Sequence, residues 1–96
     1  MAVAGDNVTR TVVSILGQEY RLRGTEPEEY IKQLAAYVDR RLRQTLQKYP
    51  NLSLNKAAVL TAMHIADEFH KLREDYETLV RLIEEEKKGS GGAARV

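Results

Sequence analysis

Hydrophobic and polar positions alternate with a period of two near the start of the chain. β-Branched side chains occupy every second position over Thr9–Ile15, and apolar residues alternate with charged ones again over 19–24. This period predicts two β-strands. Gly17-Gln18 lies between them and is expected to form the tight turn of a hairpin, because glycine admits positive φ. A two-stranded hairpin is marginal in water by itself, so its apolar face is expected to rest on a helix.

A spacing of three and four residues replaces the period of two after residue 25, and it predicts a first helix with one apolar stripe. The stripe consists of Ile31, Leu34, Ala35, Val38, Leu42, Leu46 and Tyr49. Thr25 to Glu28 has the capping-box pattern, with Pro27 tolerated in the first turn, so the helix is expected to begin there. Pro50 disfavours a helical conformation at the residue before it and ends the helix.

A second helix follows, capped by Ser53 or Asn55, and it meets no glycine or proline until Gly89. Its first half is apolar nearly all round, so we expect it to be enclosed by the hairpin, the first helix and a partner chain. Further along, apolar residues alternate by four and three, which is the a/d seam of a coiled coil. The seam that we expect to form an oligomer interface consists of Ala62, Ile65, Phe69, Leu72, Tyr76, Leu79 and Ile83. The alternative is a long amphipathic helix that folds back on its own core.

These elements predict an α+β protein with a small head, formed by the hairpin and the first helix, followed by a long C-terminal helix in an intermolecular coiled coil. We expect a flexible N-terminus over 1–8, the head over 9–62, the coiled-coil part of the second helix over 63–88, and a flexible glycine-rich tail over 89–96. With 96 residues, the chain has room for one small domain.

Composition excludes several classes of protein. The chain has no cysteine, hence no disulfide framework or thiolate zinc site, and its net charge of +1 is too balanced to indicate nucleic-acid binding. Apolar runs such as 57–60 are far shorter than the roughly 20 residues of a membrane span, so no membrane insertion is expected. Residues 1–7 lack the basic start and apolar core of a secretion signal, which indicates a cytoplasmic protein.

No catalytic, cofactor-binding or metal site is expected. His64 and His70 are six residues apart on one helix, whereas a helical zinc pair is spaced by four. We expect His64 to pair with Asp67 or Glu68, one helical turn on, and His70 to pair similarly with Glu74. The serines and threonines have no histidine or lysine at the spacing of a nucleophile motif, and no glycine pattern matches a phosphate-binding loop.

A ridge of tyrosine and basic side chains runs beside the apolar stripe of the first helix. It consists of Tyr30, Tyr37, Arg41, Gln44 and Lys48, extended by Arg40 and Arg43. In one interpretation the tyrosines cover the edge of the core and the bases keep the surface soluble. In the other, the ridge contacts an acidic protein partner, because aromatic residues and arginine are enriched at interfaces.

The order of three short motifs resembles the ZapA family of cell-division proteins. They are Ile/Leu-Gly-x-x-Tyr at Leu16–Tyr20, Val-Asp-x-x-Leu at Val38–Leu42 and Lys-Ala-Ala-Val-Leu at Lys56–Leu60. The resemblance runs from about Thr9 to Ile83 and is greatest to the short form of Gram-positive bacteria. The chain departs from the family pattern in three places: at His64, where an asparagine is common, at Gln18, where the hairpin turn often carries a basic residue, and in a tail that ends earlier than in the long form.

The resemblance implies a homodimer that shares its head interface, and a homotetramer in which two dimers join through antiparallel tails. It implies that the heads bind polymers of the tubulin-like GTPase FtsZ and bundle them in the Z-ring at mid-cell. The FtsZ-contact candidates are Tyr37, Arg40, Arg41, Arg43 and Lys48. Two alternatives remain: a small helical dimer that binds DNA through its basic residues, and a coiled-coil adaptor for another partner.

Overall fold

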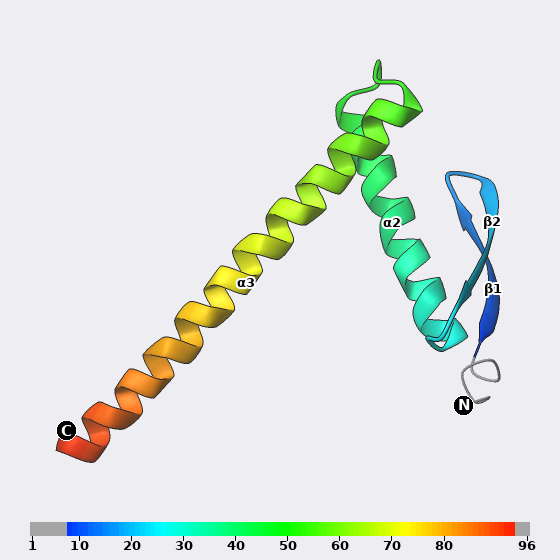
Figure 1. Cartoon of the computed structure of the whole chain (residues 1–96). Helices are drawn as coiled ribbons and strands as arrows, with labels where there is room; N and C mark the ends of the chain where they lie inside the picture. The colour runs from blue at the N-terminus through cyan, green and yellow to red at the C-terminus, as the bar shows by residue number, and fades with distance from the viewer. Residues whose placement is uncertain (1–7, 94–96) are drawn as a thin grey trace. The chain divides into compact units, whose positions relative to one another are not determined.

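The computed structural model describes residues 8–93, with side chains to residue 87, and its elements follow in the order β1, β2, α2, α3. Strands β1 (Thr9–Ile15) and β2 (Gln18–Gly24) precede helices α2 (Glu28–Lys48) and α3 (Leu54–Ala93), as Figure 1 shows. The predicted α+β class, with a hairpin, a first helix and a long C-terminal helix, is confirmed. The chain divides into two units after Thr61.

The hairpin turn consists of Leu16 and Gly17. The strands are antiparallel and Ile15 pairs with Gln18, so Gln18 belongs to β2 and the predicted Gly17-Gln18 turn is wrong by one residue. Both turn residues have positive φ, 52° at Leu16 and 79° at Gly17. Two successive positive φ values give the backbone twist that a two-residue hairpin loop requires. The sequence predicted positive φ for the glycine of the turn alone, whereas Leu16 adopts positive φ as well.

The core of the first unit lies between β1 and α2. Val13, Ile31 and Ala35 are buried together, and Ile15 packs against them. As predicted, the inner face of the hairpin rests on a helix, but α2 contacts β1 and leaves β2 more open. Tyr20 therefore stays 45% exposed, although the strand register places it opposite Val13 on the same face.

Helix α2 begins without the predicted capping box. Pro27 is the N-cap residue, no side chain caps the helix, and the Ile31 N–H donates to the Pro27 carbonyl at 3.1 Å. Thr25 lies two residues before the N-cap, too early for its hydroxyl to serve the first free N–H groups. At the other end the prediction is confirmed, because the helix stops at Lys48 and the Tyr49 N–H donates to the Thr45 carbonyl at 2.8 Å.

Ser53, one of the two predicted caps, precedes the first residue of α3 and caps the helix. The Lys56 N–H donates to Ser53 Oγ at 3.2 Å, and the Ala57 N–H donates to the Ser53 carbonyl at 2.9 Å. The helix continues past Gly89 to Ala93, where a flexible tail over 89–96 was predicted. A glycine inside a helix costs only about 1 kcal/mol and does not end it by itself. The rest of that tail, and the predicted flexible terminus apart from Val8, lie outside the described residues.

Two buried threonines join α2 to the first turns of α3 within the first unit. Thr45 Oγ1 and Thr61 Oγ1 are 2.6 Å apart, and the Thr45 hydroxyl also donates to the Arg41 carbonyl at 3.1 Å. Ala57, one turn before Thr61, is fully buried. Small side chains at this contact allow the two helices to approach closely. Within residues 8–93, no helix is both long enough and apolar enough to span a membrane.

Candidate interaction surfaces

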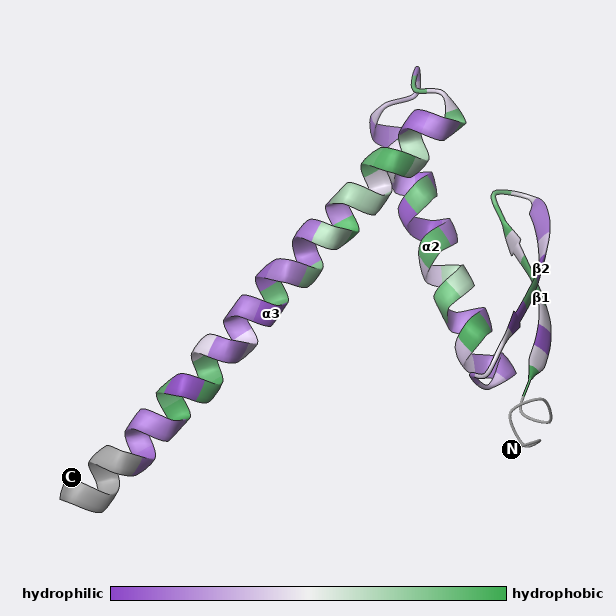
Figure 2. Ribbon diagram, in the orientation of Figure 1, coloured by the Kyte–Doolittle hydropathy of each residue, from purple (hydrophilic) through white to green (hydrophobic). Residues whose placement is uncertain are grey.

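The predicted seam is an uncovered apolar face of α3. Figure 2 shows hydrophobic positions recurring along this helix among hydrophilic ones. The large side chains of the seam are at least half exposed: Phe69 56%, Leu72 69%, Tyr76 66%, Leu79 55% and Ile83 50%. Ala62 is also exposed, and Ile65 is half-buried. Monomeric proteins rarely expose so extended an apolar surface, so this face has the character of an interaction site.

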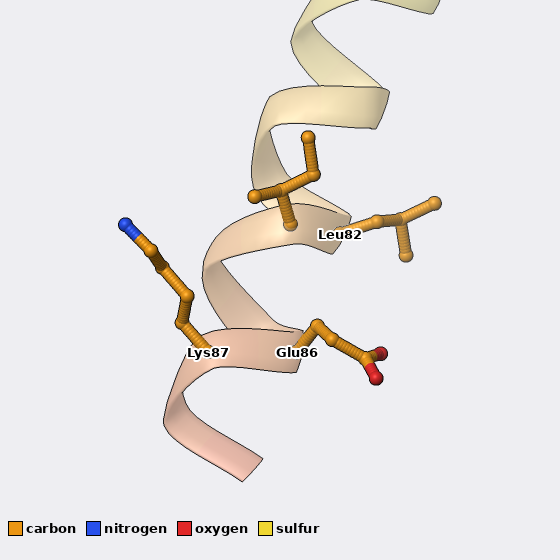
Figure 3. A pocket seen from close by; sticks show the side chains of 4 residues that line it. Leu82, Glu86 and Lys87 are labelled. Atoms are coloured by element: carbon orange, nitrogen blue, oxygen red, sulfur yellow. The ribbon is translucent and has the colours of Figure 1, made fainter. Parts of the chain in front are cut away.

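The apolar face continues to the last turns whose side chains are described. Leu82 and Ile83 are 55% and 50% exposed, and with Glu86 and Lys87 they line a shallow hollow, seen in Figure 3. Glu86 follows Leu82 by four residues and Lys87 follows Ile83 by four, so each aliphatic side chain has a charged neighbour one helical turn further on. Such a surface offers an apolar centre with a polar rim, which is the usual anatomy of a protein interface.

The other faces of α3 carry exposed ion pairs. Lys71 pairs with Asp67, one of the two carboxylates expected to pair with His64, at 3.1 Å. His70 makes an edge contact with the ring of Phe69, with 5.6 Å between the centroids. Exposed pairs stabilise a helix only slightly, so these residues mainly keep the helix soluble. Among the described residues, no three histidine or acidic side chains are grouped as a metal site would need.

Part of the basic ridge on α2 is organised around one tyrosine. The Tyr37 hydroxyl accepts a hydrogen bond from Arg41 Nη1 at 2.7 Å. The guanidinium carbons of Arg40 and Arg41 lie 5.2 and 5.6 Å from the centre of its ring, within cation–π range. The structure thus brings three of the five candidate residues together in one cluster.

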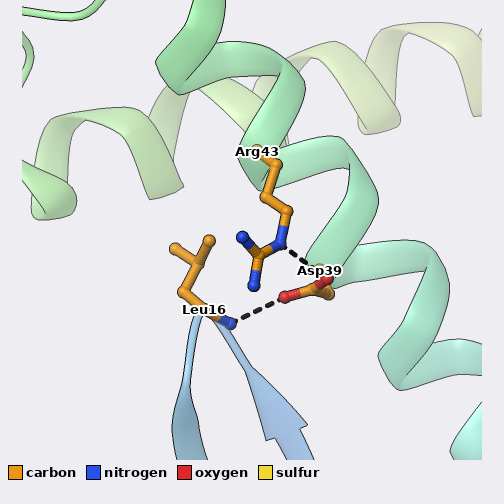
Figure 4. A network of polar contacts seen from close by, with 3 residues as sticks. All are labelled: Leu16, Asp39 and Arg43. Carbon is orange, nitrogen blue, oxygen red and sulfur yellow. Dashed lines mark hydrogen bonds and ion pairs between the residues drawn. The ribbon is translucent and has the colours of Figure 1, made fainter.

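Arg43 belongs to a different network. Its Nε donates to Asp39 Oδ2 at 2.9 Å, and Asp39 Oδ1 accepts the Leu16 N–H at 2.7 Å, as Figure 4 shows. The hydrogen bond from Arg43, followed by that from Leu16, lowers the pKa of Asp39 below its ordinary value. Arg43 therefore helps to hold the hairpin turn on α2, a role that sequence reasoning missed. The four-residue spacing of Asp39 and Arg43 could have predicted their ion pair, but not the hydrogen bond from Leu16.

Lys48 lies apart from both groups, in the last turn of α2. Its ammonium is 5.7 Å from the centre of the Tyr49 ring, and Tyr49 is 40% exposed. A cation in this position also complements the negative end of the helix dipole. The five candidate residues therefore form three local groups rather than one continuous ridge.

Comparison with known proteins identifies the family. The family model described as cell division protein ZapA matches residues 11–89. A cell division protein ZapA of Geobacillus sp. strain WCH70 is 39% identical over 85 residues, which covers 88% of this chain and 98% of that protein. The ZapA of Bacillus subtilis strain 168 is 38% identical over 77 residues, covering 80% of this chain and 91% of that protein.

A solved structure agrees with these relatives in fold. A ZapA mutant dimer from Geobacillus stearothermophilus aligns with a TM-score of 0.63 and 40% sequence identity, covering 80% of this chain and 90% of that chain. The predicted family resemblance is confirmed by sequence and by structure. From the match over residues 11–89 and the identity to full-length relatives, it follows that the chain belongs to the ZapA family of cell division proteins.

Proposed function

We propose that the chain is a non-enzymatic crosslinker of FtsZ polymers, acting in the cytoplasm at the division site. Two chains share a head interface in a dimer, and antiparallel contact between the seams of α3 joins two dimers into a tetramer with heads at both ends. The observation that carries this proposal is the uncovered seam from Phe69 to Ile83, whose large side chains are all at least half exposed.

The seam supports self-association because of its spacing as well as its exposure. Side chains that alternate by three and four residues can insert between those of a second helix along their whole length. An identical chain offers a surface of the same length and pattern. The solved relative is itself a dimer, which supports the same behaviour here.

A tetramer with heads at both ends explains how weak contacts align polymers. Once one end is bound, the other is held near a neighbouring polymer at a high effective concentration. Two weak contacts then act together without requiring either to be tight. The function needs no cofactor and no catalytic group.

The basic residues of α2 supply the FtsZ contact in this proposal. Arg40 and Lys48 are exposed, whereas Arg43 is bound to Asp39. Exposed charges contribute roughly 0.2 to 1 kcal/mol each, so several copies must act together. Tyr37, with its ring beside two guanidinium groups, adds aromatic surface of the kind enriched at interfaces.

Co-sedimentation with GTP-polymerised FtsZ tests the proposal. The wild-type chain is expected to increase the FtsZ in the low-speed pellet, and added salt is expected to weaken the effect. The variant Arg40→Glu with Lys48→Glu should lose most of this bundling while light scattering still finds a tetramer. Arg10→Glu with Lys32→Glu makes the same change of charge at exposed positions outside the second half of α2 and serves as the control.

Two results would contradict the proposal. If the wild-type chain leaves FtsZ sedimentation unchanged, the chain is not an FtsZ crosslinker. That result would favour the alternative of a coiled-coil adaptor for another partner. Binding to duplex DNA that falls steeply with salt and needs no FtsZ would favour the DNA-binding alternative.

A further inference from the structure

A small hollow on the head lies between the hairpin turn and the second half of α2. It is lined by Leu16, Arg43, Leu46 and Gln47. Both leucines are half-buried, so their side chains form aliphatic walls that solvent still reaches. Figure 4 shows the Leu16 side chain next to the Arg43 guanidinium. The hollow therefore combines an apolar interior with a basic side chain at its edge.

Leu16 is an unfavourable residue for the turn that it occupies. Its φ of 52° lies in the left-handed region, which glycine, asparagine and aspartate adopt more readily than leucine. The hydrogen bond from its N–H to Asp39 holds the turn in place. Strained residues that are fixed by their surroundings concentrate at functional sites. Because glycine or asparagine would adopt this backbone conformation more readily, the turn alone does not explain the leucine side chain.

The charge around the hollow indicates what it binds. Residues 39–48 contain Arg40, Arg41, Arg43 and Lys48 against the single acid Asp39, a formal charge of 4 − 1 = +3. The Asp39 carboxylate is already paired with Arg43, so it does not repel an incoming anion as a free carboxylate would. The complement of this surface is an acidic segment that presents an aliphatic side chain.

We infer that the hollow receives an aliphatic side chain from an acidic segment on the surface of the FtsZ polymer. Leu16 is then the wall that selects the aliphatic group, and Asp39 is a positioning residue that acts through the turn. This inference rests on the proposed function, because it assigns the place where the head meets the polymer.

The variant Leu16→Asn separates a binding role from a structural one. Asparagine accepts positive φ better than leucine does, so the thermal stability of the full chain should stay equal or rise. The tetramer should persist, since the turn is remote in sequence from the seam. Affinity for GTP-polymerised FtsZ should fall about tenfold, the effect of removing one well-packed interface anchor. If Leu16 served only the turn, the variant would bind as the wild type does.

A pair of opposite charge changes at Gln47 tests the same hollow without touching the turn. Gln47→Glu should weaken FtsZ binding about two- to fivefold, and Gln47→Lys should strengthen it by a similar factor. The controls Gln33→Glu and Gln33→Lys make identical changes at another exposed position of α2, fourteen residues earlier, and should leave binding unchanged. If Leu16→Asn does not fold, this pair decides the question.

The outcomes distinguish this inference from the proposed function. Normal binding by both Leu16→Asn and the Gln47 variants, with a binding wild type, would overturn the hollow as the contact site and leave the crosslinker intact. Failure of the wild-type chain to bind would instead show that the proposed function is wrong, and this inference would fall with it.

Discussion

Leu79→Glu places a charge in the C-terminal part of the seam. Leu79 is 55% exposed, so about half of its surface is left to be buried by association. Full burial of a leucine side chain stabilises by about 1.5 to 3 kcal/mol, and the remaining half by about 0.8 to 1.7 kcal/mol. Four copies in a tetramer lose about 3 to 7 kcal/mol, before the cost of desolvating four carboxylates is added. A loss of about 4 kcal/mol weakens association about a thousandfold.

Light scattering coupled to size-exclusion chromatography measures this effect. At micromolar concentration the wild-type chain should elute as a tetramer and Leu79→Glu as a smaller species. Thr78→Glu introduces the same charge at the preceding exposed residue, about 100° around the helix from Leu79, and should leave the tetramer intact. A Leu79→Glu variant that is still tetrameric under these conditions would refute the seam as the assembly interface.

Two further predictions concern the head. Because Arg43 and the Leu16 N–H lower the pKa of Asp39, its stabilising effect is present above the ordinary pKa of an aspartate and is lost as pH falls through the lowered value. The urea midpoint of the wild type should therefore exceed that of Asp39→Asn at pH 7, and the difference should shrink in acid. Thr45→Val removes the hydrogen-bond partner of the buried Thr61 hydroxyl and should lower the free energy of unfolding by about 1 to 3 kcal/mol. The reciprocal Thr61→Val should cost less, because Thr45 keeps its bond to a backbone carbonyl; equal costs would contradict this asymmetry.

Periodicity was sufficient to predict the elements because apolar residues recur at a regular spacing in each one. The alternation in β1 appears in the structure as buried Thr11 and Val13 beside exposed Val12 and Ser14. The stripe of α2 likewise buries Ile31, although Leu34 on the same stripe remains 46% exposed. The pattern predicts which face is apolar, but it does not predict how much of that face a neighbouring element covers.

The boundaries were less predictable, because they depend on competition between local signals. The capping-box pattern predicted Thr25 as the cap, but Pro27 is the N-cap residue, and its extended backbone places the helix start at Glu28. The hairpin turn lies one residue earlier than predicted, with Leu16 at positive φ and its N–H donating to Asp39 of α2. A local propensity of this kind is overridden whenever a tertiary hydrogen bond stabilises the alternative.

For the candidate contact residues too, the sequence predicted the helix on which they lie but not their side-chain partners. Their sequence spacing placed them on α2, but only side-chain geometry separated Arg43, which holds Asp39, from Arg40 and Arg41, which lie beside the ring of Tyr37. A spacing of three or four residues identifies neighbours on a helix without saying which of several neighbours a long side chain contacts.

The sequence by itself determined the strands, the two helices, the apolar stripe of the second helix and the family, because these depend on periodic side-chain patterns and short motifs that a linear chain displays directly. Only the tertiary structure decided that Asp39 fixes Leu16 across 23 residues, that Thr45 meets Thr61, and that a hollow opens beside the turn. Such contacts depend on where the folded backbone brings distant residues together, and no local pattern in the sequence encodes that distance.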